Sequence, residues 1–377
     1  MIVKLGSLIS EYSVRNKDDE DIPVYSVTNE QGFCTGYFSK DVASQDRTTY
    51  KIVPRGYFAY NPSRINVVSV DVQECEDRVI VSPLYVVFSV DEKLNRRYLL
   101  HYLKSDITLT YIKSYASGSV RDNLKFSILK DFPINLPSAE EQKQIVDTLD
   151  GIEHLIALRK VEIASLDELV KSRFIELFGD PIANQFGWDT TNIGTIVTEV
   201  RYGTSIPAVE NGKYPYLRMN NLTFDVHLDL KDLKRIDIPD EEIEKCIVRK
   251  GDVLFNRTNS VELVGKTCVF DLDDDMVIAG YIIRVRLNEK ALPVFLSAYM
   301  NSAILKEHLR GMAKGAVNQA NINARELQGI QIYLPPIELQ QQFAEFVEQV
   351  EKAKQVIKEQ LEQLEILKKS LMQKYFG

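Results

Sequence analysis

Two long stretches of the chain place apolar residues at alternating steps of four and three. Starting from Ile145 in the first stretch and from Phe343 in the second, eight of ten such steps meet an apolar residue. The charged exceptions are Arg159, Arg173, Lys354 and Lys368. This spacing predicts a coiled-coil seam. A helix of about 40 residues would be about 60 Å long, too long to be buried within one domain, so we expect the two seams to pack on each other.

The two stretches are copies of one sequence. Residues 136–179 align without a gap with residues 334–377, at a constant offset of 198 and with thirteen identical positions. Each copy starts with a proline-containing segment, LPSAEEQ or LPPIELQ, and closes on Phe-Gly. Proline suits the start of a helix and glycine its end. We therefore predict one long spacer helix in residues 136–179 and another in residues 334–377.

The sequence before each helix is repeated more weakly. LGSLISE at Leu5 matches IGTIVTE at Ile193, and RGYFAYN at Arg55 matches KGDVLFN at Lys250. Self-similarity over such distances indicates a duplicated architecture. The predicted domains are 1–135, a first globular head, and 180–333, a second one, each followed by its spacer helix.

The heads are predicted to be mixed α/β (α+β) domains. Short β-branched and aromatic runs with turn glycines, such as those from Tyr50 and from Val277, predict strands. NRRYLLHYLKS at Asn95 and PVFLSAYMNSAILKEHL at Pro293 each predict one helix. The polar stretch KGAVNQANINARELQGIQI from Lys314 predicts a loop and a short helix.

Connectivity predicts how two such helices pair. The first must run from the first head to the second, so an antiparallel partner would run back and bring Gly377 close to Met1. The expectation is a dumbbell with a pseudo-twofold axis across an antiparallel coiled coil.

Composition limits the class of protein. The chain has 377 residues, of which 45% are hydrophobic and 27% charged, as in globular proteins of two or three domains. Without a signal-peptide pattern or a membrane-length apolar run, the expected location is cytoplasmic. The four histidines are dispersed, and the cysteines form no C-x-x-C pair, so no metal site or disulfide framework is predicted. The cysteines are Cys34, Cys75, Cys246 and Cys268.

Charge is unevenly distributed along the chain. The net charge is −8, and half of that excess lies on residues 136–179, which carry nine acidic and five basic residues. The first head, residues 1–135, is balanced at seventeen of each. We interpret the acidic helix as a docking surface for other proteins. The alternative is that its charges only keep the chain soluble.

Polar loops at matching places in both heads carry side chains that can contact nucleic acid. Arginine pairs with guanine, asparagine and glutamine pair with adenine, and glycine and hydroxyl residues let backbone amides approach phosphate. The alternative is that these residues simply form loops. The candidate DNA contacts are Arg47, Tyr60, Asn61, Arg64, Asn66, Ser119, Arg121, Arg201, Arg218, Asn220, Asn221, Arg257, Thr258, Asn259, Lys314, Asn318 and Gln319.

With these features, the chain resembles the specificity subunit of type I restriction-modification enzymes. The resemblance rests on the LPxxEQ-type helix start and Phe-Gly end, both present twice, and on GDVLFNRTNS at Gly251, LVGK at Leu263 and KGAVNQANI at Lys314. It covers essentially the whole chain. It implies that each head is a target-recognition domain that reads one half of a split DNA sequence in the major groove. The helices would set the unread gap and dock modification subunits.

The same resemblance implies the partners and where catalysis occurs. The partners would be double-stranded DNA, two modification (methyltransferase) subunits and restriction (endonuclease/translocase) subunits, without a membrane. S-adenosylmethionine, ATP and Mg²⁺ would be used by those subunits. This chain would be a non-catalytic recognition subunit with no catalytic, cofactor-binding or metal-binding residues of its own.

Two other functions agree less well with the sequence. AYNPS at Ala59 partly matches the Asn-Pro-Pro-aromatic motif of adenine methyltransferases, but the second proline and the aromatic residue are missing. The sequence also lacks a glycine-rich turn for S-adenosylmethionine and a P-loop. The remaining alternative is a coiled-coil adaptor that holds two protein partners at a fixed separation without binding DNA.

Overall fold

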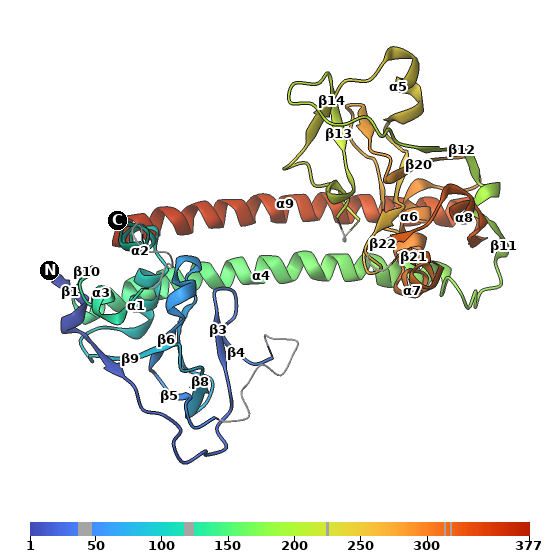
Figure 1. The fold of residues 1–377 in the computed structure, drawn as a ribbon. Coiled ribbons are helices and arrows are strands. Elements are labelled where there is room, and N and C mark those ends of the chain that lie inside the picture. Colours follow the sequence, from blue (N-terminus) through green and yellow to red (C-terminus); the bar gives the residue numbers. More distant parts are fainter. Residues whose placement is uncertain (37–46, 117–123, 224–225, 313, 317–318) are drawn as a thin grey trace. The chain divides into compact units, whose positions relative to one another are not determined.

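The computed structural model describes residues 1–36, 47–116, 124–223, 226–312, 314–316 and 319–377. By its internal contacts the chain forms two compact units, residues 1–160 with 359–377 and residues 161–358 (Figure 1). Each unit contains one head and half of each long helix. Within the described residues, no helix is both long enough and apolar enough to cross a membrane.

The first head is built on a four-stranded antiparallel sheet in the order β2-β9-β6-β7. Its strands are β2 (Ile9–Tyr12), β9 (Val86–Val90), β6 (Phe58–Tyr60) and β7 (Val70–Val72). Two-stranded pairs are β1 (Ile2–Lys4) with β10 (Pro133–Asn135), β3 (Ser26–Thr28) with β4 (Gly32–Cys34), and β5 (Lys51–Pro54) with β8 (Arg78–Val81). The helices are η1 (Leu5–Ser7), η2 (Pro62–Val67), α1 (Arg96–Leu103), α2 (Asp106–Ala116) and α3 (Phe126–Leu129).

The second head has a corresponding antiparallel sheet in the order β12-β20-β16-β18. Its strands are β12 (Val197–Tyr202), β20 (Ile282–Leu287), β16 (Val253–Asn256) and β18 (Thr267–Val269). A second four-stranded sheet has the order β14 (Lys234–Ile236), β13 (Tyr214–Leu217), β19 (Met276–Ile278) and β15 (Ile247–Val248). A three-stranded sheet has the order β17 (Thr258–Asn259), β22 (Gln319–Asn321) and β21 (Lys314–Ala316). The strands β11 (Asp189–Asn192) and β23 (Gln331–Leu334) form a separate pair. The helices are η3 (Ile193–Thr195), η4 (Met219–Asn221), α5 (Asp240–Cys246), α6 (Pro293–Asn301), α7 (Ala303–Met312) and α8 (Ala324–Gly329).

The two sheets share one strand plan. In the first head, β2 pairs with β9, and β9 pairs with β6, the strand of the RGYFAYN motif. In the second head, β12 pairs with β20, and β20 pairs with β16, the strand of the KGDVLFN motif. That motif strand then pairs with the next strand along the chain. The predicted duplication of a mixed α/β head is therefore confirmed.

The two predicted spacer helices are α4 (Ala139–Phe178) and α9 (Ile337–Phe376), each 40 residues long. All twenty positions of the predicted seam are buried or half-buried. In the first unit, Lys368 near the end of α9 pairs with Glu153 near the start of α4, at 2.7 Å. In the second unit, the Phe174 and Phe343 rings lie 5.6 Å apart, which joins the end of α4 to the start of α9. The helices therefore pack antiparallel within each unit.

The repeated glutamine explains why the chain carries the LPxxEQ pattern twice. Gln142 is fully buried, accepts a hydrogen bond from the Asn95 amide at 2.7 Å and donates to the carbonyls of Lys93 and Pro137. Gln340 makes the same three bonds in the second unit, starting with the Leu292 amide at 2.9 Å. Because a buried amide must satisfy its polar atoms, each glutamine fixes the start of its helix to its own head.

The closing Phe-Gly of each long helix has a different role, because it packs on the other head. Phe178, at the end of α4, is fully buried in the core of the second head against Phe295, with ring centres 5.0 Å apart. Phe376, at the end of α9, packs on the core of the first head, 5.2 Å from the Tyr98 ring. Both chain ends accordingly lie in the first unit (Figure 1).

Two local predictions were wrong. The helix predicted from Pro293 is two helices, because Ser302 has extended backbone that ends α6, and its hydroxyl then accepts from the Leu305 amide to start α7. The stretch from Lys314 is not only a loop and a helix, since strands β21 and β22 pair as a hairpin before α8. A polar, asparagine-rich sequence gave no alternation from which a strand could be predicted.

Candidate nucleic-acid interface

The structure describes most of the predicted DNA contacts. Ser119, Arg121 and Asn318 lie outside the described residues. For another three, the backbone alone is described. These are Asn66 in η2, Lys314 in β21 and Gln319 in β22.

In the first head, the candidates gather on the 3₁₀ turn η2 that follows strand β6. Asn61 caps this turn, its side chain accepting from the Ser63 amide at 3.0 Å, as asparagine commonly does at such positions. Arg64 lies one turn further and is exposed. Arg47, on a separate segment, lies 3.8 Å from Asp21 in a solvent-exposed ion pair. Among the candidates of η2 whose side chains are described, Arg64 is therefore the one exposed to solvent.

In the second head, one candidate group lies on the turn η4. The Asn221 side chain accepts from the Arg218 amide at 2.8 Å and donates to the Asp229 carbonyl, so it locks the turn from inside. The Arg218 guanidinium donates to the Asp232 carboxylate at 2.8 Å. Met219 and Asn220 are left exposed at the tip of the turn. The turn is therefore a rigid support for these two side chains.

A second group follows strand β16. The Arg257 guanidinium lies 4.8 Å from the centre of the Tyr202 ring and donates to the Gly280 carbonyl at 3.2 Å. Its Nε is buried and has no hydrogen-bond acceptor among the described residues. Stacking and one hydrogen bond hold the planar group in place before any ligand binds. Asn259, two residues on, is half-buried.

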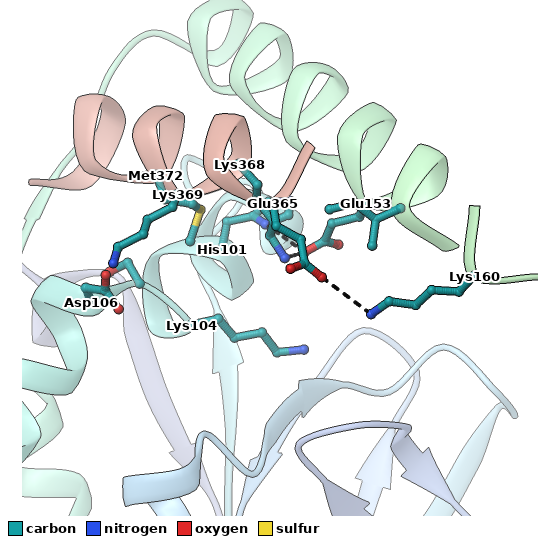
Figure 2. Close-up of a pocket in the computed structure, with 11 residues that line it drawn as sticks. His101, Lys104, Asp106, Glu153, Lys160, Glu365, Lys368, Lys369 and Met372 are labelled. Carbon is teal, nitrogen blue, oxygen red and sulfur yellow. Dashed lines mark ion pairs between the residues drawn. The ribbon is translucent and has the colours of Figure 1, made fainter. Parts of the chain in front are cut away.

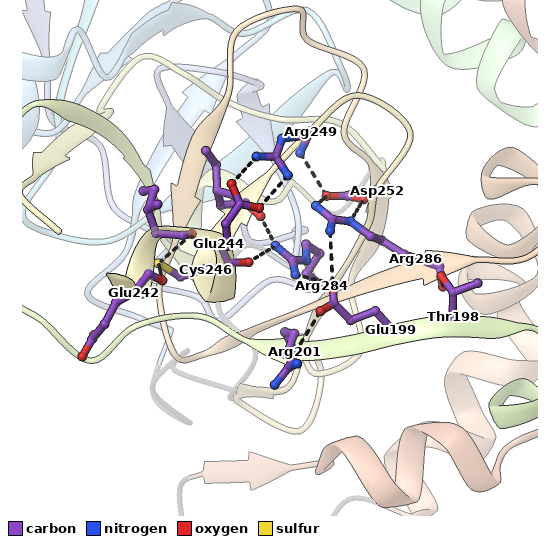
Figure 3. A network of polar contacts seen from close by, with 12 residues as sticks. Thr198, Glu199, Arg201, Glu242, Glu244, Cys246, Arg249, Asp252, Arg284 and Arg286 are labelled. Carbon is purple, nitrogen blue, oxygen red and sulfur yellow. Dashed lines mark hydrogen bonds and ion pairs between the residues drawn. The ribbon is translucent and has the colours of Figure 1, made fainter. Parts of the chain in front are cut away.

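A network of charged residues in the second head links strand β20 to strand β12, to Ile247 of β15 and to Asp252 just before β16 (Figure 3). Fully buried Arg284 donates to Glu199 at 2.5 Å and to the Ile247 carbonyl, and Arg286 bridges Glu199 and Asp252. Burial raises the pKa of Glu199, but the hydrogen bond from Arg201 and the neighbouring guanidinium groups outweigh it and leave the pKa below its usual value. The predicted contact Arg201 is thus paired with a carboxylate at 3.0 Å.

Three predicted contacts are buried, and for these the prediction of direct DNA contact is corrected. Tyr60 is fully buried and donates its hydroxyl to the Leu124 carbonyl at 3.0 Å. Thr258 donates to the Asn321 side chain at 2.9 Å, and Asn221 is the internal lock of η4 described above. Their hydrogen bonds are satisfied within the protein, so they shape the loops instead of reaching out of them.

Sequence spacing missed two clusters in which a histidine meets two carboxylates. In the first anchor, defined as Arg97, His101, Asp150, Glu153 and Lys368, the buried His101 ring lies 2.7 Å from Asp150. Arg97 also pairs with Asp150 at 2.7 Å, and Lys368 pairs with Glu153. Burial lowers the pKa of His101, although both carboxylates oppose this shift. The cluster joins the first head to both long helices.

The second anchor is defined as Asp167, His227, Glu351 and Lys354. The Lys354 ammonium lies at its centre, 2.6 Å from Asp167, 2.9 Å from Glu351 and 2.9 Å from His227. A cationic side chain thus occupies the position between the oxygen and nitrogen ligands that a metal ion would take. We therefore assign both anchors to the attachment of heads to helices.

A cavity of about 380 Å³ lies beside the first anchor (Figure 2). Its charged side chains are partly paired with one another, as Lys160 is with Glu365 at 3.8 Å. The lining residues are His101, Lys104, Ser105, Asp106, Glu153, Ile156, Lys160, Glu365, Lys368, Lys369 and Met372. The cavity belongs to the junction between α1, α2 and the helix pair.

Comparison with known proteins decides the family. The sequence profile of the type I restriction modification DNA specificity domain matches residues 4–168 and matches again at 187–366. The chain belongs to this family. The two matches cover both heads and most of α4 and α9, so the duplication and the family expected from the sequence are both confirmed.

Curated relatives from this family are distant in sequence. The type I restriction enzyme EcoKI specificity subunit of Escherichia coli (strain K12) is 23% identical over 269 residues, which cover 67% of this chain and 58% of the relative. The putative type I restriction enzyme MjaX specificity subunit of Methanocaldococcus jannaschii is 30% identical over 193 residues, covering 50% of this chain and 45% of the relative. The chain thus spans about half the length of these relatives.

Solved structures share the fold over the whole chain. A chain from the structure described as "Structural basis underlying complex assembly and conformational transition of the type I R-M system" aligns with a TM-score of 0.60 at 20% identity, covering 100% of this chain and 97% of that one. The S subunit of a type I restriction-modification system from M. genitalium aligns with a TM-score of 0.56 at 14% identity, covering 100% and 96%. These similarities confirm the fold of paired long helices and two heads.

Proposed function

We propose that this chain is the DNA-specificity subunit of a type I restriction-modification complex, in which each head reads one half of a bipartite DNA site. The observation that carries the proposal is the matching position of one recognition turn in two like heads. The turn η2, which contains Arg64, follows the RGYFAYN strand, β6, and the segment that contains Arg257 follows the KGDVLFN strand, β16. A duplicated scaffold that carries different sequences after the equivalent strand, PSRIN in the first head and RTNSV in the second, suits two different half-sites.

The exposed side chains on these turns have the chemistry that reads bases. An arginine can pair with both acceptors of guanine in the major groove, and an asparagine can do the same for adenine. Arg64 in the first head, and Asn220 with Arg257 in the second, are the leading candidates for base contacts. Arg201 pairs with Glu199 and Arg218 pairs with Asp232, so we assign these two arginines to positioning or to phosphate contact.

The long helices are proposed to set the gap between half-sites and to dock modification subunits. Exposed apolar residues occur at equivalent positions of the two helices, 198 residues apart, and such residues are common at protein interfaces. These equivalent pairs are Leu158 with Val356 and Leu169 with Leu367. A surface that occurs twice suits two copies of one partner. Catalysis, with S-adenosylmethionine, ATP and Mg²⁺, is assigned to the partner subunits.

The test is to map methylated adenines in a genome that carries the complete system. The proposal expects one two-part motif with a fixed gap, and exchange of residues 180–333 for another second head should change only one half of it. The main alternative, a protein adaptor that does not bind DNA, expects methylation that does not follow this chain's sequence. A motif that survives exchange of the second head would overturn the assignment of one half-site to each head.

A further inference from the structure

One buried lysine links the two recognition segments of the second head. Lys266, the last residue of the LVGK segment, is only 8% exposed. Its ammonium donates to the Met219 carbonyl at 3.1 Å and to the Leu222 carbonyl, the two ends of turn η4. The exposed Asn220 lies between those two carbonyls along the chain. Lys266 therefore holds the base of the turn that presents Asn220.

The backbone around Lys266 also fixes the Arg257 segment. The Asn256 amide donates to the Lys266 carbonyl at 2.8 Å, and the Gly265 amide donates to the Asn256 carbonyl at 2.9 Å. The Asn256 side chain, fully buried, donates to the same Met219 carbonyl at 3.3 Å. Arg257 follows directly. One cluster of hydrogen bonds thus sets the position of turn η4 relative to Arg257.

The geometry of the LVGK segment suits this role. Gly265 has a φ of +79°, a conformation that residues with a side chain rarely adopt. Its carbonyl accepts from the ammonium of Lys306 on α7, so the helix also holds this segment. The 8% exposed Lys266 is largely removed from water, and this burial lowers the pKa of its ammonium. A desolvated ammonium retains strong directional hydrogen bonds, because leaving its donors unpaired costs several kcal/mol.

Among the described residues of the first head, no such link exists at the equivalent position. There, the Asn61 amide donates to the Ser69 carbonyl, just before strand β7, as the Asn256 amide donates to Lys266 just before strand β18. Ser69 is buried, and its side chain is too short to span to a neighbouring turn. The two heads therefore share the same backbone hydrogen bond at this position and differ in the side chain there, which is Ser69 in the first head and Lys266 in the second.

We propose that Lys266 is a specificity-determining residue of the second half-site, acting by positioning the Met219–Leu222 turn beside Arg257 without touching DNA. The inference rests on the proposed DNA-recognition function. It predicts that removal of the Lys266 ammonium changes which bases are preferred in one half of the site. A residue that only stabilised the fold would lower methylation of all sequences equally.

The experiment uses the complete complex, assembled with wild-type chain or with Lys266→Met, Lys266→Ser or Lys290→Met. Methylation rates are measured on DNA in which each base pair of either half-site is varied in turn. Lys266→Met keeps the aliphatic stem without the donors, and Lys266→Ser installs the residue of the first head. Lys290 is an exposed lysine of the same head and serves as the matched control. Unfolding of each chain is followed in parallel by fluorescence of the single tryptophan, Trp188.

In the expected result, both Lys266 variants lose about tenfold or more of the base preference in the second half-site, the range of one good base contact. Preference in the first half-site stays at the wild-type level, as it does in both halves for Lys290→Met. An unchanged second-half preference, or an equal loss on every sequence, would overturn the inference. If Lys266→Met does not fold, Lys266→Gln, which keeps an amide donor, must still show a weakened second-half preference, and unchanged preference again overturns it.

Failure of the proposed function would look different. If the wild-type complex itself methylates without any sequence preference, the DNA-specificity assignment fails before any variant is compared. A sequence-specific wild type with a Lys266→Met variant of identical preference leaves that assignment in place and rejects only the role of Lys266.

Discussion

Replacing Lys354 with alanine tests whether the second anchor holds the second unit together. The Lys354 side chain is 2% exposed, and its ammonium contacts Asp167, Glu351 and His227 within 2.9 Å. Removing one partner from a fully buried ion pair costs about 3–5 kcal/mol. Here the two carboxylates are 28% and 38% exposed, so water can solvate them in the variant. We therefore expect a loss of about 2–3 kcal/mol, at or just below the lower end of that range.

The assay is urea unfolding followed by Trp188 fluorescence. Trp188 lies in the second unit, where its indole donates to the Phe178 carbonyl at 2.9 Å, so its emission reports on the core in which α4 ends. The matched control is Lys352→Ala, on the same helix. Lys352 is 73% exposed and pairs with Glu348 at 2.5 Å, a solvent-exposed ion pair whose loss should change the stability little.

The pH dependence gives a second check. Burial lowers the pKa of Lys354, but hydrogen bonds to Asp167 and Glu351 outweigh it and raise the pKa above its ordinary value. A lysine whose pKa is raised on folding contributes stability that is fully present below the unfolded pKa of about 10.4 and is lost above it. The difference between Lys354→Ala and wild type should therefore stay constant from about pH 7 to 9. Equal, small effects of Lys354→Ala and Lys352→Ala would refute the reasoning.

Three further predictions concern recognition, proton uptake and the helix ends. Arg257→Ala should weaken binding to the correct second half-site by about 1–3 kcal/mol in competition assays, whereas a uniform loss on all sequences would indicate a phosphate contact. Burial, with nearby positive charges, lowers the pKa of Lys306 to about 7, so the stability of the second unit should rise with pH between about 7 and 10. Lys306→Met should reduce this slope in Trp188-monitored unfolding. Phe376→Ala should remove ring contacts in the first head and speed hydrogen exchange in α1 by about tenfold or more, with the Trp188 transition unchanged.

The long helices could be predicted from sequence because a seam of fixed period is a local pattern. The same pattern contained a signal that was not used. In the second helix the seam is interrupted at Lys354 and Lys368, and each of these lysines belongs to one of the two anchors. Charged residues at seam positions commonly specify register, so an interruption predicts a buried partner. That partner could not be named, because His227 and Asp167 are distant in sequence and only folding brings them to Lys354.

The recognition surface could be predicted only in part. Residue type selected three segments that the structure describes as turns or strand ends, namely η2, η4 and the segment after β16. It could not separate exposed residues from buried ones within a loop, as Asn220 and its neighbour Asn221 demonstrate. That difference depends on the direction in which each side chain leaves a 3₁₀ turn. Lys266 could not be predicted from the sequence, because its acceptors lie more than 40 residues away along the chain.

The placement of Phe376 has a consequence for biosynthesis. The aromatic cluster of the first head includes this residue, which the ribosome adds only after the entire second head has been made. Until then, the apolar stripe of α4 and the facing side of Tyr98 and Tyr102 have no α9 to cover them. The packing of the first head therefore becomes complete only when a segment more than 200 residues further along the chain has been synthesised.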